Sequence, residues 1–338
     1  MSDRVIVKSA ITDVLEKLLK ARRVFAPVQR DGLLRFEPLR TGDEPLLDSH
    51  NSKRPLKEIF FPHSETLFAY EEGEVAIMPL PEEQRVIFGV RPCDARSLLL
   101  LDKVFNAPDV QDPYYVTRRE NTILIGLGCN RPLSTCFCTT LGGGPFTTEG
   151  LDLLFTDLGD RYLVETVTER GEALVADSPY FREAAPADVN LKAEIAARAE
   201  QTISGPSVEG IKEKLDGMYE DPFWDELHQK CLGCAVCTYL CPTCHCFDIL
   251  DEKEGSRGRR VRIWDSCQFP LFTLHASGHN PRPSGRERMR QRIMHKFHYF
   301  VENYGQIACV GCGRCIRNCP VNMDLREVLN RIVVKRGA

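Results

Sequence analysis

The chain has 338 residues, enough for two domains that each bury a core of their own. A formal net charge of −4, with 27% charged and 43% hydrophobic residues, excludes wholesale disorder. Fifteen cysteines are too many for an ordinary cytosolic enzyme, and their odd number excludes a complete disulfide framework. Charges near the start do not fit a secretory signal peptide, and no apolar stretch has the length of a membrane span. We therefore expect a cytoplasmic protein whose cysteines stay reduced.

The first half of the chain predicts a sheet-containing domain. Apolar residues at helical spacing predict a helix over 11–19, and further helices are predicted after residue 94 and over 190–200. A stretch at 204–210 has linker composition, so we place the boundary between an α+β or α/β domain (1–205) and a second domain (206–338) there. Short apolar runs separated by Gly, Pro and Asp predict strands at 33–36, 75–78, 86–90, 123–127, 151–155 and 162–167.

Four cysteines of this first domain lie just beyond predicted strand ends or in loops rich in Gly and Pro: Cys93, Cys129, Cys136 and Cys138. Cys93 lies near the expected start of a helix, where unpaired N–H groups favour a thiolate. Four thiols are the number that one cubane cluster needs, but their spacing here is irregular. An iron–sulfur cluster, a zinc ion and plain buried thiols all stay open for this set.

The second domain contains two cysteine runs of one design, Cys231-x2-Cys234-x2-Cys237-x3-Cys241-Pro and Cys309-x2-Cys312-x2-Cys315-x3-Cys319-Pro. This spacing is typical of [4Fe-4S] clusters and exceeds what a zinc site needs. In two-cluster ferredoxins the fourth cysteine of each run binds the other cluster. The expected ligand sets are therefore Cys231, Cys234, Cys237 and Cys319 for one cluster, and Cys309, Cys312, Cys315 and Cys241 for the other.

The remainder of the second domain has helical character. Asp265 and Ser284 are candidate N-caps, and Gly305 is placed to end the helix that Ser284 begins. An apolar stripe at 325–333 predicts a last helix. We therefore expect an all-α helical module that carries two [4Fe-4S] clusters.

Three more cysteines lie between the two runs: Cys244, Cys246 and Cys267. The sequence from Cys241 to His245 also fits the attachment pattern of c-type haem. Because Cys241 already belongs to a cluster motif, and c-type haem is attached outside the cytoplasm, we expect no haem. The three thiols either bind a further cluster with one ligand from elsewhere, or lie beside the other clusters and tune them without binding iron.

The stretch from 257 to 296 has a strong excess of Lys and Arg over Asp and Glu. It can be a solvated helix face, a counter-charge for negative clusters, or a docking face for an acidic partner. Nucleic-acid binding is a remote alternative, because no aromatic platform accompanies the basic residues.

Taken together, the motifs resemble the beta subunits of cytoplasmic nickel–iron hydrogenases of the sulfhydrogenase type, to which the corresponding 4Fe-4S dicluster subunit of anaerobic sulfite reductase is similar. The Arg-Pro-Cys-Asp and Cys-Phe-Cys motifs of the first domain are the more telling part, because a ferredoxin needs neither. The residues that carry the resemblance are 89–96, 135–138, 231–247, 264–267 and 309–320.

The resemblance implies an electron-transfer subunit that relays single electrons between two partners: a flavin-containing subunit linked to NAD(P)H, and a hydrogenase or other reductase subunit. No catalytic triad, carboxylate pair or phosphate-binding loop is evident, so we expect no catalytic residues and no flavin on this chain. One alternative is a subunit that reduces a sulfur or disulfide substrate at an open cluster, as in an anaerobic sulfite reductase complex. The other is a nucleic-acid-binding protein with structural clusters.

Overall fold

The computed structural model describes residues 3–176 and 178–335, and the chain divides into two compact units. The first unit comprises Met1–Leu56, Pro81–Gly205 and Val310–Cys312. The second comprises Lys57–Leu80, Pro206–Cys309 and Gly313–Ala338. Each unit thus includes a shorter segment from the far side of residue 205, and a boundary there stays a prediction.

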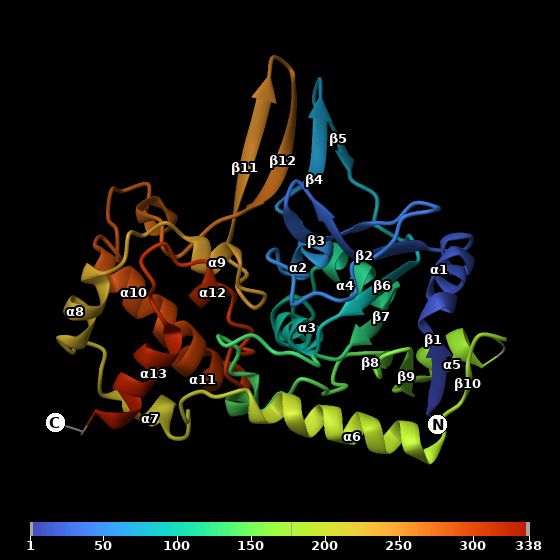
Figure 1. Cartoon of the computed structure of the whole chain (residues 1–338). Coiled ribbons are helices and arrows are strands. Elements are labelled where there is room, and N and C mark those ends of the chain that lie inside the picture. The colour runs from blue at the N-terminus through green and yellow to red at the C-terminus, as the bar shows by residue number, and fades with distance from the viewer. Residues whose placement is uncertain (1–2, 177, 336–338) are drawn as a thin grey trace. The chain divides into compact units, whose positions relative to one another are not determined.

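An eight-stranded sheet forms the centre of the first unit (Figure 1). Its order is β10-β1-β9-β8-β7-β6-β2-β3, in which the neighbours from β8 to β2 run parallel and the outer pairs run antiparallel. The strands are β1 (Arg4–Val7), β2 (Arg23–Arg30), β3 (Leu33–Pro38), β6 (Arg85–Val90), β7 (Thr122–Leu127), β8 (Leu153–Asp157), β9 (Arg161–Thr166) and β10 (Arg182–Glu183).

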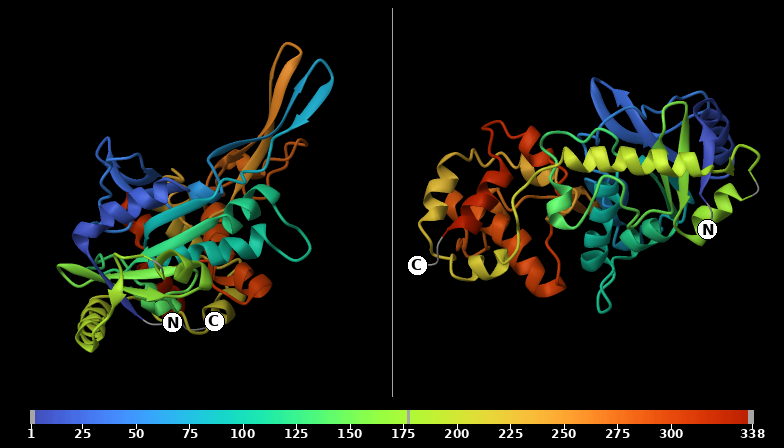
Figure 2. Two further views of the ribbon diagram at one scale, coloured as in Figure 1. Left: turned by 90° about the vertical axis from the view of Figure 1, so that its right-hand side faces the viewer. Right: turned by 60° about the horizontal axis from the view of Figure 1, so that its bottom comes forward.

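Helices cover this sheet, as Figure 2 shows from two further directions. Ile11, Leu15 and Val175 bring α1 and α5 into one apolar core with the strands. β7 is buried at every position, as expected for a strand covered on both faces. The helices are α1 (Ile11–Leu19), α3 (Pro92–Phe105), α4 (Pro113–Glu120), α5 (Glu169–Val175) and α6 (Pro186–Gln201), which confirms the helices predicted in the first half.

The helices of the second unit include the two predicted by caps and stripes. Ser284 begins α10 with a capping box, in which Glu287 accepts a hydrogen bond from the Ser284 N–H at 3.0 Å. A π-helical turn, His295–Tyr299, joins α10 to α11, and Gly305 ends α11 at a φ of +68°. The helices are α2 (Lys57–Phe60), α7 (Ile211–Asp216), α8 (Phe223–Gln229), α9 (Val236–Tyr239), α10 (Gly285–Met294), α11 (Phe300–Tyr304), α12 (Arg314–Arg317) and α13 (Leu325–Val334).

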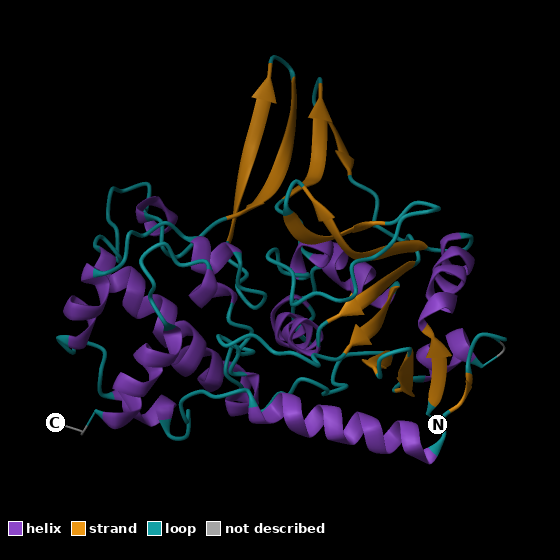
Figure 3. Cartoon of the chain, viewed as in Figure 1, coloured by secondary structure: helices purple, strands orange, loops and turns teal. Residues whose placement is uncertain are grey.

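The prediction that the C-terminal module is all-α is wrong. It contains a long hairpin, β11 (Phe247–Glu254) and β12 (Arg257–Trp264), shown in orange in Figure 3. This hairpin pairs with β4 (Ser64–Glu71) and β5 (Glu74–Ile77) in a four-stranded antiparallel sheet of order β11-β12-β4-β5. All six strands predicted in the first half are present, but β5 belongs to this second unit.

The hairpin escaped prediction because charge, and not an apolar stripe, holds much of it together. Asp251 pairs with Arg260 and Glu252 with Arg259 across the two strands. A two-residue turn with Gly255 at a φ of +62° closes the hairpin. The predicted N-cap Asp265 is also wrong as a cap, because it follows β12 and begins no helix. Within the described ranges, no helix combines the length and the apolar character needed to cross a membrane.

Candidate metal centres

The two cysteine runs share one local backbone. Gly233 and Ala235 have φ values of +65° and +62°, and the equivalent Gly311 and Gly313 have +64° and +72°. In the first run the Gly233 nitrogen lies 3.3 Å from the sulfur of Cys231. Left-handed residues of this kind turn successive N–H groups toward one side, where they can surround an anion. The helices α9 and α12 follow the two loops and pack against each other, so the runs repeat in structure as well as in spacing.

The cysteines expected to bind the first cluster line one cavity of about 50 Å³ in the second unit: Cys231, Cys234, Cys237 and Cys319. Apolar side chains of α10 and α13 form much of the remaining wall, with Arg292 as its cation. The Met323 nitrogen lies 3.3 Å from the sulfur of Cys319. Thiols, backbone N–H groups and a cation thus converge on one water-poor space.

The sulfur of Cys241 is held by polar contacts. Lys296 Nζ lies 3.2 Å from Cys241 Sγ, 3.0 Å from Thr243 Oγ1 and 2.9 Å from the carbonyl oxygen of Ala308. The Thr243 hydroxyl is itself 3.2 Å from the same sulfur. Lys296 lies in the π-helical turn between α10 and α11, and such turns are frequent at functional sites.

The other members of the second expected set are distributed between the units. Cys309, Cys315 and Cys241 belong to the second unit, and Cys312 is grouped with the first. Within the second unit, the charge of Lys296 acts on both Cys241 and Cys309. The fold therefore brings the last cysteine of the first run toward the first cysteine of the second run.

Three cations of the second unit are buried against thiols: Lys57, Arg292 and Lys296, which are 2%, 6% and 3% exposed. Lys57 donates to the carbonyl oxygen of Cys244 at 2.6 Å, and Arg292 Nη1 lies 3.9 Å from Cys244 Sγ. Among the described residues, no carboxylate forms an ion pair with any of the three. A buried charge without a counter-charge costs several kcal/mol, so these cations require anions in their midst.

The thiols supply those anions. Burial alone would lower the pKa of Lys296, but the charges of Cys241 and Cys244 raise it above the ordinary value. A hydrogen bond from Cys244, together with the Lys296 charge, holds the pKa of Cys241 well below its ordinary value in spite of burial. By contrast, burial lowers the pKa of Lys57 to about 8, because the nearby thiols offset only part of its desolvation.

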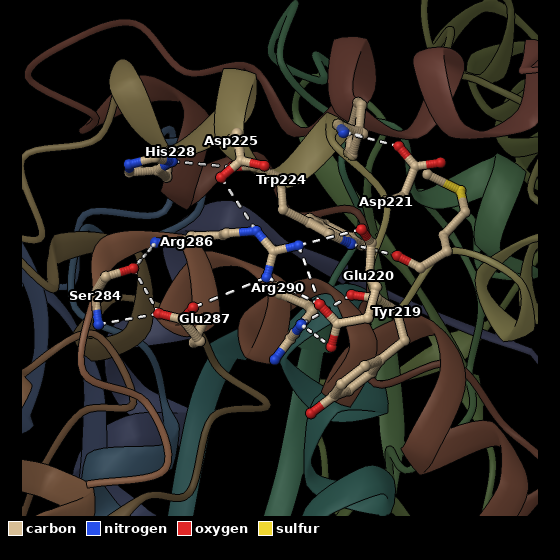
Figure 4. A network of polar contacts seen from close by, with 12 residues as sticks. Tyr219, Glu220, Asp221, Trp224, Asp225, His228, Ser284, Arg286, Glu287 and Arg290 are labelled. Carbon is tan, nitrogen blue, oxygen red and sulfur yellow. Dashed lines mark hydrogen bonds and ion pairs between the residues drawn. The ribbon is translucent and has the colours of Figure 1, made fainter.

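The rest of the basic stretch has ordinary partners. On the hairpin, Arg257 pairs with Glu71, while on α10 Arg286 pairs with Glu220 and Asp225. Figure 4 shows how these contacts tie α10 to the segment that leads through α8 into the first cysteine run. The basic excess is therefore mostly neutralised by carboxylates, and its members that face thiols are Arg292 and Lys296.

The β11–β12 hairpin brings two distant cysteines to its base. Phe247 and Trp264 are the last paired residues of the ladder, and the carbonyl oxygen of Cys246 accepts a further hydrogen bond from the Asp265 N–H at 3.0 Å. Cys246 and Cys267 thus flank the hairpin on either side. Their thiols share a hydrogen bond that raises the pKa of Cys246 and lowers that of Cys267 to about 6.

In the first unit, the four expected cysteines line a second cavity, of about 80 Å³: Cys93, Cys129, Cys136 and Cys138. Cys93 follows β6 at the start of α3, and Cys129 follows β7. The cavity thus lies at the carboxyl ends of neighbouring parallel strands, where open α/β sheets bind their ligands. The fold brings together thiols whose spacing in the sequence is irregular.

The wall of this cavity is built from backbone and from Arg91. The guanidinium of Arg91 donates to carbonyl oxygens of the loops, including that of Gly128 at 2.5 Å. Gly311 approaches the Cys-Phe-Cys loop so closely that an added Cβ would lie 2.5 Å from the Cys138 nitrogen. Burial raises the pKa of Cys138 to about 12, so a free thiol here keeps its proton until something binds it.

All fifteen cysteines are free of disulfides. In the part of the chain that the structure describes, no three His, Cys, Asp or Glu side chains are placed to share a single metal ion. That finding concerns single ions, whereas a cubane cluster is a four-iron body with a ligand at each iron. The donors suit such a cluster in kind: grouped thiols, N–H groups near sulfurs, and buried cations that need anions.

These features define an iron–sulfur protein built for electron transfer. The sequence pattern of the 4Fe-4S dicluster domain matches residues 230–323. The chain is also 34% identical, over 325 residues and 95% of each chain, to the sulfhydrogenase 2 subunit beta of Pyrococcus furiosus. The chain therefore belongs to the family of sulfhydrogenase beta subunits and is an iron–sulfur electron-transfer subunit, which confirms the resemblance found in the sequence.

Sequence reasoning missed the buried cations and Thr243. Arg292 and Lys296 were counted only as part of a basic stretch, although they interrupt the apolar stripe of Met289, Ile293 and Phe297. That interruption is a usable signal, because a cation inside a buried stripe needs a partner. No signal marks Lys57, which reaches the site only through the pairing of β4 with β12.

Proposed function

We propose that this subunit carries two [4Fe-4S] clusters and relays single electrons within a cytoplasmic hydrogenase complex. The ligands are Cys231, Cys234, Cys237 and Cys319 for one cluster, and Cys309, Cys312, Cys315 and Cys241 for the other. The observation that carries the proposal is the burial of Lys57, Arg292 and Lys296 against thiols with no carboxylate partner among the described residues. Cluster-bound thiolates supply the negative charge that these cations need.

A further cluster in the first unit belongs to this proposal. Its ligands are Cys93, Cys129, Cys136 and Cys138. Their convergence on one cavity at the carboxyl edge of the parallel strands supports it. This cluster would extend the electron path beyond the dicluster domain, whose match begins at residue 230.

When bound, the clusters supply one-electron chemistry at sulfur-ligated iron. The work of the chain is to hold thiolates, direct N–H groups at their sulfurs and keep water away. The contacts of Gly233 and Met323 with cysteine sulfurs, and of Lys296 with Cys241, stabilise negative charge. Each such contact favours the reduced form and therefore raises the reduction potential.

The partners that fit this activity are a flavin-containing, NAD(P)H-linked subunit on one side and a hydrogenase subunit on the other. The chain itself holds neither flavin nor haem in this proposal. The relative's own name, a sulfhydrogenase beta subunit, supports assembly with hydrogenase subunits. The alternative partner is a sulfite reductase subunit, and co-purification separates the two.

The test is an anaerobic affinity purification of the tagged chain, followed by identification of the proteins that accompany it. We expect a flavoprotein and a nickel–iron subunit, and we expect NADPH or NADH to reduce the clusters of the complex but not those of the isolated chain. A sirohaem subunit in place of the nickel–iron subunit would contradict the hydrogenase assignment. Turnover of sulfite or a disulfide by the isolated chain would contradict the relay.

A further inference from the structure

Three thiols that belong to neither cysteine run meet at the base of the β11–β12 hairpin. Cys246 and Cys267 flank the last ladder positions, and Cys244 lies two residues before Cys246. Cys267 is buried, and the other two are half-buried. Because the hairpin fixes both of its ends, these thiols are held in place by the same strands that the sequence failed to predict.

Lys57 faces this group. Its ammonium is 2% exposed, donates to the carbonyl oxygen of Cys244 at 2.6 Å, and lies 4.0 Å from the centre of the Trp264 ring. A carbonyl group and an aromatic face solvate a cation but do not neutralise it. No carboxylate pairs with Lys57 in the described part of the chain, so its charge requires another anion.

The cysteine runs already account for the other two buried cations. Lys296 contacts the sulfur of Cys241, and Arg292 lines the cavity of the first run. Lys57 instead faces Cys244 and Cys246, on which its charge acts together with Cys241. If Cys244 and Cys246 were neutral thiols, Lys57 would have no anion of its own.

From this we infer a further iron–sulfur cluster site in the second unit, bound through Cys244, Cys246 and Cys267, with Lys57 as its counter-charge. Each thiol loses its proton to solvent when its sulfur binds iron, and no electron is exchanged in that step. A cubane has four irons, so one iron keeps a ligand other than these three thiolates. The inference rests on the proposed function for its cofactor class, and it adds a site outside both runs.

The site is tested on the anaerobic full-length protein with a Cys246→Ser/Cys267→Ser double variant. Iron and acid-labile sulfide are measured per chain beside the wild type. We expect a loss of about four irons, while the magnetic interaction between the two clusters of the runs persists. An unchanged iron content would overturn the inference, whereas absence of that interaction in the wild type would count against the proposed function instead.

Ser266→Ala is the matched control. Ser266 is buried at the same hairpin base and hydrogen-bonds to Thr238, but its replacement removes no thiol. We expect this variant to keep its full iron content. A loss of iron equal to that of the double variant would show that disturbing the hairpin alone is sufficient, and would overturn the inference.

Lys57→Met decides the matter if the double variant fails to fold. With a cluster at the site, removing the counter-charge shifts the midpoint potential of one cluster to a more negative value and lowers the melting temperature. With neutral thiols, the same change removes an uncompensated buried charge and raises the melting temperature. A rise in melting temperature with every midpoint potential unchanged would overturn the inference.

Discussion

The two thiol-bearing regions of this protein solve the same problem by different means. In the second unit, cysteines arrive from short repeated loops, and buried cations face their sulfurs. In the first unit, cysteines arrive from separate strand ends, and Arg91 spends its hydrogen bonds on backbone carbonyl oxygens. The difference teaches that a regular run can be recognised in the sequence, whereas a site assembled at a sheet edge depends on the fold, and that the two sites meet different local charge.

The largest effect is expected from Cys237→Ser in the first run. Its thiol lines the cavity shared with Cys231, Cys234 and Cys319, so the substitution should remove about four irons and destabilise the second unit. Iron analysis and thermal unfolding of the anaerobic protein measure both effects. Full iron content with an unchanged melting temperature would contradict the ligand assignment.

A Cys136→Ala/Cys138→Ala double variant tests the other region. We expect it to lose the irons of the first unit, because both thiols line that cavity, and to keep the interacting pair of clusters in the second unit. Electron paramagnetic resonance of the reduced protein separates the two contributions. Retention of all iron would remove the first-unit cluster while leaving the dicluster domain in place.

Lys296→Met removes a buried cation from the better-charged region. The change breaks contacts with Cys241 Sγ and Thr243 Oγ1, so we expect a loss of about 3 kcal/mol in the free energy of unfolding. One cluster should also titrate at a more negative potential, because its reduced form loses a nearby positive charge. Lys296→Arg keeps the charge and should restore most of the potential. Equal potentials in wild type and Lys296→Met would contradict the assignment of Cys241 as a ligand.

A matched pair of glycines gives the smallest effects and compares the loops directly. Gly311→Ala forces a Cβ to within 2.5 Å of the Cys138 nitrogen, in addition to its left-handed backbone, and should cost about 3 kcal/mol. Gly233→Ala has the same backbone strain but a nearest contact of 3.7 Å, so about 1 kcal/mol is expected. Chemical denaturation under anaerobic conditions measures both. Equal costs would mean that packing against Cys138 contributes nothing.

Much of this account could be predicted from the sequence where the pattern is local. The cysteine spacing identified the cofactor class, and apolar runs predicted β6 and β7 because both faces of these strands are covered. The capping box at Ser284 predicted α10 for the same reason, since its partners lie within one turn.

What could not be predicted depends on partners distant in sequence. The β11–β12 hairpin is held by cross-strand ion pairs such as that of Asp251 with Arg260, and such charges resemble an exposed helix in the sequence. Lys57 becomes part of a thiol site only because β4 pairs with β12. Its carbonyl and aromatic contacts have no signature in the residues around it.

The central claim is that the two cysteine runs bind two neighbouring cubane clusters. Iron analysis combined with electron paramagnetic resonance of the reduced, fully reconstituted anaerobic protein tests it most directly. We predict about eight or more irons per chain and a spectrum broadened by at least two interacting clusters. About four irons or fewer, with a single isolated signal, would contradict the account.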